Sequence, residues 1–142
     1  MFVRIPKFVQ RIFPSIIWKK KTHTKQIWLT FDDGPEKNIT EFILSVLKEL
    51  DVKATFFLVG EQIIKFPELT KKILKDGHNI GNHSLSHING FKANNQKYLY
   101  DVEMGEKLVN EKKVELGVER KNKIFRPPSK SLENIINPKQ LL

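Results

Sequence analysis

Short apolar runs and longer helical repeats alternate along most of this chain. Four short segments are expected to be strands: residues 27–31, 54–59, 78–82 and 124–125. Three longer segments repeat apolar residues every three or four positions, as the buried face of a helix does: residues 39–50, 67–74 and 95–116. Gly77 and Gly117 are placed to end the second and third of these helices. Strands that alternate with helices predict an α/β fold with a parallel sheet.

The first run, residues 27–31, is rich in β-forming residues and is expected to be a buried strand. It ends at Asp32-Asp33-Gly34-Pro35, whose composition predicts an abrupt turn.

Residues 1–26 form a basic, amphipathic segment ahead of these elements. Six of its apolar residues fall at helical spacing: Phe8, Val9, Ile12, Phe13, Ile16 and Ile17. The segment could pack against the domain, or residues 1–21 could make a peripheral contact with anionic lipid. Its longest uninterrupted apolar piece is residues 16–18, which predicts neither a cleavable signal peptide nor a membrane-spanning helix. The expected location is therefore cytoplasmic or membrane-peripheral.

Composition and charge narrow the classes of function. The 142 residues, 39% of them hydrophobic and 29% charged, are typical of one globular domain. The absence of cysteine excludes disulfides, thiolate metal ligands and a cysteine nucleophile. The net charge, 25 − 16 = +9, is compatible with nucleic-acid binding, with attraction to acidic polymers or membranes, or with a solubility bias. No nucleic-acid-binding motif accompanies the dispersed lysines, so no nucleic-acid partner is predicted.

Residues that can carry chemistry follow the predicted strands. Asp32 and Asp33 come after the first strand, His83 after the third and Arg126 after the fourth, and the carboxyl ends of parallel strands are where sites form. His87 lies four residues beyond His83, which in a helical turn would place both rings on one face. Two histidines and one aspartate form a ligand set that suits Zn²⁺, Fe²⁺ or Co²⁺ with positions left open. The alternatives are an ordinary polar turn, a chance histidine pair and a surface ion pair at Arg126.

These segments resemble the signature motifs of the polysaccharide deacetylase family, the NodB-homology domain of carbohydrate esterase family 4. Thr30 to Pro35 is similar to its first motif, and Gly77 to His87 is similar to its second, which contains H-(S/T)-x-x-H. Phe125-Arg126-Pro127-Pro128 resembles the start of the third motif. The resemblance covers residues 27–128.

The resemblance implies an α/β fold of the distorted (β/α) barrel type, incomplete at its C-terminus. It implies that Asp32 is the general base, that Arg126 holds it ionised and oriented, and that Asp33, His83 and His87 bind one divalent metal ion. Zn²⁺ is expected, with Co²⁺ or Fe²⁺ as alternatives. The implied activity is hydrolysis of N-acetyl or O-acetyl groups of a polysaccharide, such as peptidoglycan or chitin oligomers.

The sequence departs from the family pattern after Pro128. Ser129-Lys130 stands where the family has an aromatic residue and glycine, and the family's later Asp-Trp and Leu-x-His motifs are not found. We therefore expect residues 27–128 to be a partial deacetylase domain, residues 129–142 to be an irregular tail, and the activity to be impaired by truncation. The alternatives are an inactive remnant that binds metal or glycan, and a basic protein that binds membranes or polyanions. The oligomeric state is not predicted.

Overall fold

The structure is a computed structural model that describes residues 7–12, 25–90, 92–118 and 123–128. The chain divides into two units, one made of residues 1–27 and 135–142, the other of residues 28–134. The described part of the first unit contains helix α1 (Lys7–Ile12), within the segment predicted to be amphipathic. Residues 1–6 and 13–24 of that predicted segment, and the predicted tail 129–142, lie outside the described residues. No helix in the described ranges is long and apolar enough to cross a membrane.

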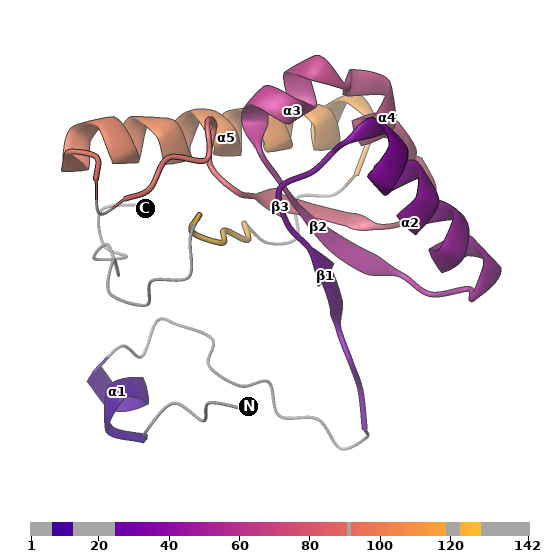
Figure 1. Cartoon of the computed structure of the whole chain (residues 1–142), viewed down its shortest axis with the longest axis horizontal. Helices are drawn as coiled ribbons and strands as arrows, with labels where there is room; N and C mark the ends of the chain where they lie inside the picture. The colour runs from indigo at the N-terminus through magenta and orange to yellow at the C-terminus, as the bar shows by residue number, and fades with distance from the viewer. Residues whose placement is uncertain (1–6, 13–24, 91, 119–122, 129–142) are drawn as a thin grey trace. The chain divides into compact units, whose positions relative to one another are not determined.

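The second unit is built on a parallel sheet with the order β1-β2-β3 (Figure 1). Its strands are β1 (Leu29–Phe31), β2 (Ala54–Leu58) and β3 (Asn79–Asn82). In the register, Phe31 pairs with Phe56 and Phe56 pairs with Ile80. The prediction of an α/β fold with a parallel sheet is confirmed. The predicted fourth strand is reduced to one parallel bridge between Asn82 and Phe125.

The helices of this unit are α2 (Lys37–Glu49), α3 (Gly60–Lys65), α4 (Pro67–Lys75) and α5 (Asn95–Glu115). Glu36 and Asn94 cap α2 and α5, because each side chain accepts a backbone N–H of the first turn. Gly77 and Gly117, with φ of 80° and 65°, follow the ends of α4 and α5 as the sequence predicts. Helix α3 was not predicted, since it is too short for an apolar period to show.

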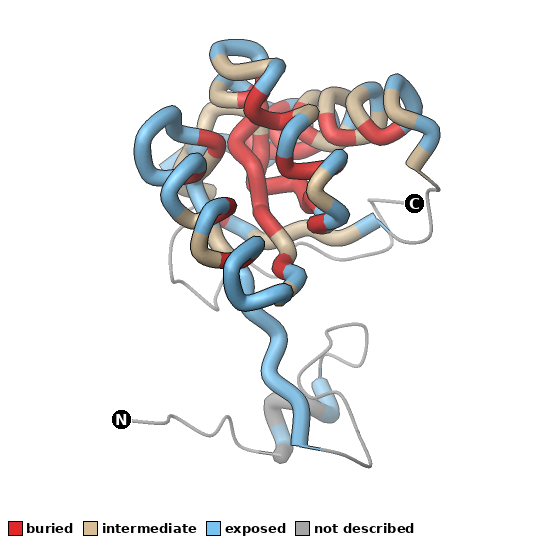
Figure 2. The backbone as a smooth tube through the Cα atoms, turned by 90° about the vertical axis from the view of Figure 1, so that its right-hand side faces the viewer, coloured by how far each residue is buried: buried red, intermediate tan, exposed pale blue. Residues whose placement is uncertain are grey.

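The core lies between the sheet and the helices, where Figure 2 shows the buried part of the chain. Its buried residues come from β2, β3 and the four helices of this unit: Leu44, Leu47, Ala54, Phe56, Leu58, Ile63, Leu69, Ile73, Leu74, Ile80 and Val109. Helix α5 packs on β3 and on α3, and α4 packs on β3. The core therefore fixes β2 and β3, and with them the loop that follows β3.

The strand predicted at residues 27–31 is present as β1, but the prediction that it is buried is wrong. Trp28 and Leu29 are 52% and 40% exposed, and Phe31 is only half-buried. Among the described residues, β1 pairs with β2 alone and is an edge strand. A short apolar run predicts a strand but does not distinguish a central strand from an edge. In helix α2, too, the apolar pattern does not match burial, because Phe42 of its apolar stripe is exposed while Leu44 and Leu47 are buried.

Candidate metal centre

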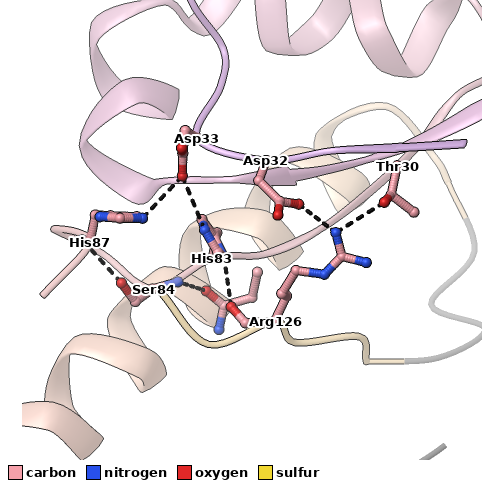
Figure 3. A network of polar contacts seen from close by, with 8 residues as sticks. Thr30, Asp32, Asp33, His83, Ser84, His87 and Arg126 are labelled. Carbon is pink, nitrogen blue, oxygen red and sulfur yellow. Dashed lines mark hydrogen bonds and ion pairs between the residues drawn. The ribbon is translucent and has the colours of Figure 1, made fainter. Parts of the chain in front are cut away.

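The two adjacent aspartates follow β1 and point to different partners (Figure 3). Asp33 has a φ of 69°, in the left-handed region, and this backbone conformation separates the two carboxylates. Asp32 lies toward Arg126, whereas Asp33 lies toward the two histidines. The turn predicted at this position thus distributes two negative charges between two sets of partners, which limits their mutual repulsion.

The histidines are presented by the loop that follows β3. His83 is buried and His87 is exposed, and their ring centroids lie 5.0 Å apart. They are not brought together by a helical turn: residues 83–87 form an irregular loop in which Ser84 and His87 have φ of 67° and 56°. The hydroxyl of Ser84 accepts the backbone N–H of His87 at 3.1 Å, which closes the loop in place of helical hydrogen bonds.

Asp33, His83 and His87 converge on one point. The Oδ1 atom of Asp33 lies 3.1 Å from Nε2 of His83 and 3.0 Å from Nε2 of His87. One ligand atom from each of the three residues lies within 4.8 Å of the other two. The structure therefore brings together all three residues that the sequence analysis selected as metal ligands.

The hydrogen bond on the far side of the His83 ring fits a metal ligand. Its Nδ1 lies 2.7 Å from the backbone carbonyl of Arg126, and a carbonyl can only accept, so Nδ1 carries the proton. In the neutral ring, Nε2 then presents its lone pair to the carboxylate of Asp33, and two acceptors this close require a cation or a proton between them. A mixed set of imidazole nitrogen and carboxylate oxygen suits Zn²⁺, Fe²⁺ or Co²⁺.

Arg126 joins the two parts of the site. Its Nη1 atom donates to Oδ1 of Asp32 at 2.6 Å and to the hydroxyl of Thr30 at 3.0 Å. Its guanidinium carbon lies 4.1 Å from the centroid of the Phe57 ring, an arrangement that adds cation–π attraction. The side chain of Arg126 thus orients Asp32, while its backbone carbonyl orients His83.

Comparison with known proteins decides the family. Residues 19–139 match the family described as polysaccharide deacetylase, which is most of the chain. The chain belongs to the polysaccharide deacetylase family. The boundaries of the partial domain at residues 27–128 stay a prediction.

Relatives of this deacetylase-family chain include peptidoglycan-N-acetylglucosamine deacetylases of Bacillus cereus. One is 47% identical over 85 residues, which are 60% of this chain and 31% of the relative. Another is 35% identical over 113 residues, which are 80% of this chain and 50% of the relative. The structure of peptidoglycan deacetylase PdaC from Bacillus subtilis matches with a TM-score of 0.68 and 31% identity, over 79% of this chain and 53% of that one. The chain thus spans about half the length, or less, of these relatives.

Two residues that support the candidate metal site, Asn82 and Asp101, were missed by the sequence analysis. Asn82 is buried, donates to the carbonyl of Val102 and accepts the backbone N–H of Ser84 at 2.8 Å. Asp101, on α5, accepts hydrogen bonds from the same loop. A signal for Asp101 was available, because this carboxylate falls in the apolar stripe of the predicted helix, three residues after Tyr98. Burial and the charge of Asp101 raise the pKa of Tyr98.

Proposed function

We propose that this chain carries the metal-binding and base-bearing part of a peptidoglycan N-acetylglucosamine deacetylase. The observation that carries the proposal is the convergence of Asp33, His83 and His87 beside a second carboxylate, Asp32, that is separately held by Arg126. The names of the relatives supply the substrate, a polysaccharide bearing N-acetyl groups. The sheet and its helices are then the first part of the distorted (β/α) barrel that the motifs imply.

In this proposal Asp33, His83 and His87 hold one divalent ion. When bound, such an ion polarises a carbonyl group and acidifies water. Three protein ligands leave coordination positions open, which is typical of catalytic rather than structural sites. The buried ring of His83 is fixed in the ligating tautomer, whereas the side chain of Asp33 is 70% exposed and reachable from solvent.

Asp32 is the general base of the proposed reaction. Asp32 is the sequence neighbour of the ligand Asp33 but does not belong to the ligand set, so its carboxylate remains available to accept a proton from an attacking water. The hydrogen bond from Arg126 fixes the position of the carboxylate and balances its charge. A base in such a position contributes about 10²–10⁴-fold to a rate.

Expulsion of the leaving group separates two classes of substrate. An amine must be protonated as it leaves, whereas a phenolate of low pKa leaves unaided. None of the described residues after His87 is a histidine that could donate this proton. We therefore expect this chain to hydrolyse an activated acetate ester faster than an N-acetylated oligosaccharide.

The test compares p-nitrophenyl acetate with an oligomer of N-acetylglucosamine, using the full chain loaded with Zn²⁺. We expect hydrolysis of the ester that is lost with a chelator and reduced about 10²-fold or more by Asp32→Asn, the loss expected for a general base. Glu36→Gln, a carboxylate that caps α2, is the control and should leave the rate unchanged. Metal uptake without hydrolysis of either substrate would instead indicate an inactive metal-binding remnant. Equal ester rates for the wild type and Asp32→Asn would overturn the role of Asp32.

A further inference from the structure

Asp101, a carboxylate outside the motifs, lies against the loop of residues 83–87 that carries the two histidines, which we call the histidine loop. Asp101 belongs to α5 and is only 6% exposed, on the same helix face as Val102, Gly105 and Val109. Burying an ionised carboxylate is unfavourable unless hydrogen bonds compensate it. The groups that surround Asp101 are therefore expected to compensate its charge.

Among the described residues, the hydrogen bonds to the Asp101 carboxylate come from the histidine loop. Oδ1 accepts from the hydroxyl of Ser86 at 2.7 Å. Oδ2 accepts the backbone N–H of Ser86 at 3.2 Å and that of Leu85 at 3.1 Å, and the latter also donates to the backbone carbonyl of Asp101 at 2.9 Å. Leu85 and Ser86 are two of the three residues between the ligands His83 and His87.

The loop needs such support because its backbone is strained. Ser84 and His87, on either side of the residues that Asp101 holds, both have φ in the left-handed region. Residues other than glycine keep this conformation only where the surrounding structure determines it. Charge-assisted hydrogen bonds to the residues between them are the kind of contact that can do so.

Close packing reinforces the contact between α5 and the loop. A Cβ atom added to Gly105 would lie 2.5 Å from Oδ1 of Asn82 and 2.6 Å from the backbone carbon of Ser84. Only glycine lets the helix approach the loop this closely. The carboxylate of Asp101, one helical turn earlier, is therefore held at a fixed distance from the loop.

We propose that Asp101 is a positioning residue for the metal site: its carboxylate fixes Leu85 and Ser86, and so sets the separation of the His83 and His87 rings. This inference rests on the proposed metal site. It assigns Asp101 no contact with substrate or metal. Partners that orient metal ligands in this way typically account for about 10–100-fold in metal affinity.

The first test measures Zn²⁺ affinity of the full chain by isothermal titration calorimetry. Asp101→Asn keeps the size of the side chain but removes the charge and one of the two acceptor oxygens, so the side chain can no longer accept from the Ser86 hydroxyl and from both N–H groups at once. We expect its dissociation constant to rise about 10–100-fold. Glu103→Gln is the matched control, because it removes the same charge from an exposed position on the same helix, and its affinity should equal that of the wild type.

A second variant separates positioning from charge and remains available if Asp101→Asn does not fold. Ser86→Ala leaves the Asp101 charge in place and removes one hydrogen bond, so we expect affinity to fall about threefold to tenfold. In metal-free protein, hydrogen exchange of the Leu85 and Ser86 amides should quicken in Asp101→Asn while that of the β2 amides does not. This readout does not depend on metal.

The outcomes distinguish the two proposals. A wild-type chain that takes up no Zn²⁺ overturns the metal site and this inference with it. A wild-type chain that binds Zn²⁺, together with folded Asp101→Asn of equal affinity, overturns the role of Asp101 alone. Unchanged affinity in Ser86→Ala also contradicts it, because any loss in Asp101→Asn would then come from charge.

Discussion

His83 follows a strand with neighbours on both sides, whereas Asp32 and Asp33 follow a strand that, among the described residues, has a neighbour on one side only. Strand β3 pairs with β2 and, through Asn82, with Phe125. Strand β1 pairs with β2 alone. The ligand that directly follows each strand reflects this difference, with a side chain 4% exposed for His83 and 70% exposed for Asp33, while His87, farther along its loop, is 42% exposed.

This difference shows that the two parts of the site owe their geometry to different interactions. The histidine loop is tied to α5 and to Arg126 by buried and part-buried hydrogen bonds, which are costly to break. The aspartates depend on a three-residue strand and on the side chain of Arg126. The histidine part is therefore built into the fold, and the aspartate part is the more easily displaced.

The largest expected effect comes from comparing one apolar residue of β3 with one of β1. Ile80 in β3 is fully buried, whereas Leu29 in β1 is 40% exposed. We expect Ile80→Ala to lower the free energy of unfolding by about 2–5 kcal/mol, because it leaves a cavity. Leu29→Ala, at an exposed position, should cost about 0.5 kcal/mol. Urea denaturation of the metal-free chain measures both, and equal losses would remove the contrast between the strands.

The next effect separates the two roles of Arg126. Arg126→Gln removes the guanidinium beside Asp32 but keeps the backbone carbonyl that orients His83. We expect hydrolysis of p-nitrophenyl acetate to fall about 10-fold to 100-fold, less than loss of the base itself, while Zn²⁺ affinity stays near that of the wild type. A large loss of affinity, with the fold intact by circular dichroism, would show that the two parts of the site are not separable.

The smallest effect concerns the pH dependence of the free energy of unfolding. It comes from a histidine bonded to β2, the strand between β1 and β3. His78 is buried, and its Nδ1 atom accepts the backbone N–H of Ala54 at 3.3 Å. Burial, and then the charge of Lys53, lower the pKa of His78 below its ordinary value of 6.5. The folded state thus favours the neutral ring, so its stabilisation is present above pH 6.5 and is lost as pH falls from there toward the folded pKa.

One such group changes the free energy of unfolding by at most about 1.4 kcal/mol per pH unit. The check is the urea midpoint of metal-free protein at pH 7.5 and 5.5. His78→Asn, which keeps an acceptor but does not titrate, should lose less stability than the wild type over this interval. An equal loss in both would place the pH dependence elsewhere.

The sequence was sufficient to predict the parallel α/β fold, the main helices and the residues that converge on the site. Position after a strand identified Asp32, Asp33, His83 and Arg126, because parallel strands end at one edge of the sheet. Periodicity did not reveal that β1 lies at an edge, since that depends on which segment pairs beside it. The irregular loop at residues 83–87 was also hidden, because its shape is set by contacts with Asp101, which is distant in sequence, and with Asn82, whose side chain is held by the carbonyl of Val102 in α5.

The most direct test of the account is a calorimetric titration of the metal-free chain with Zn²⁺, alongside His83→Ala, Asp33→Asn and the control His23→Ala, a histidine outside the motifs. The account predicts one ion per wild-type chain and per control chain. It predicts near-complete loss of binding in His83→Ala, and a smaller loss in Asp33→Asn, because the preformed histidine loop persists. Absence of stoichiometric uptake by the folded wild type, or equal affinity in His83→Ala, would contradict it.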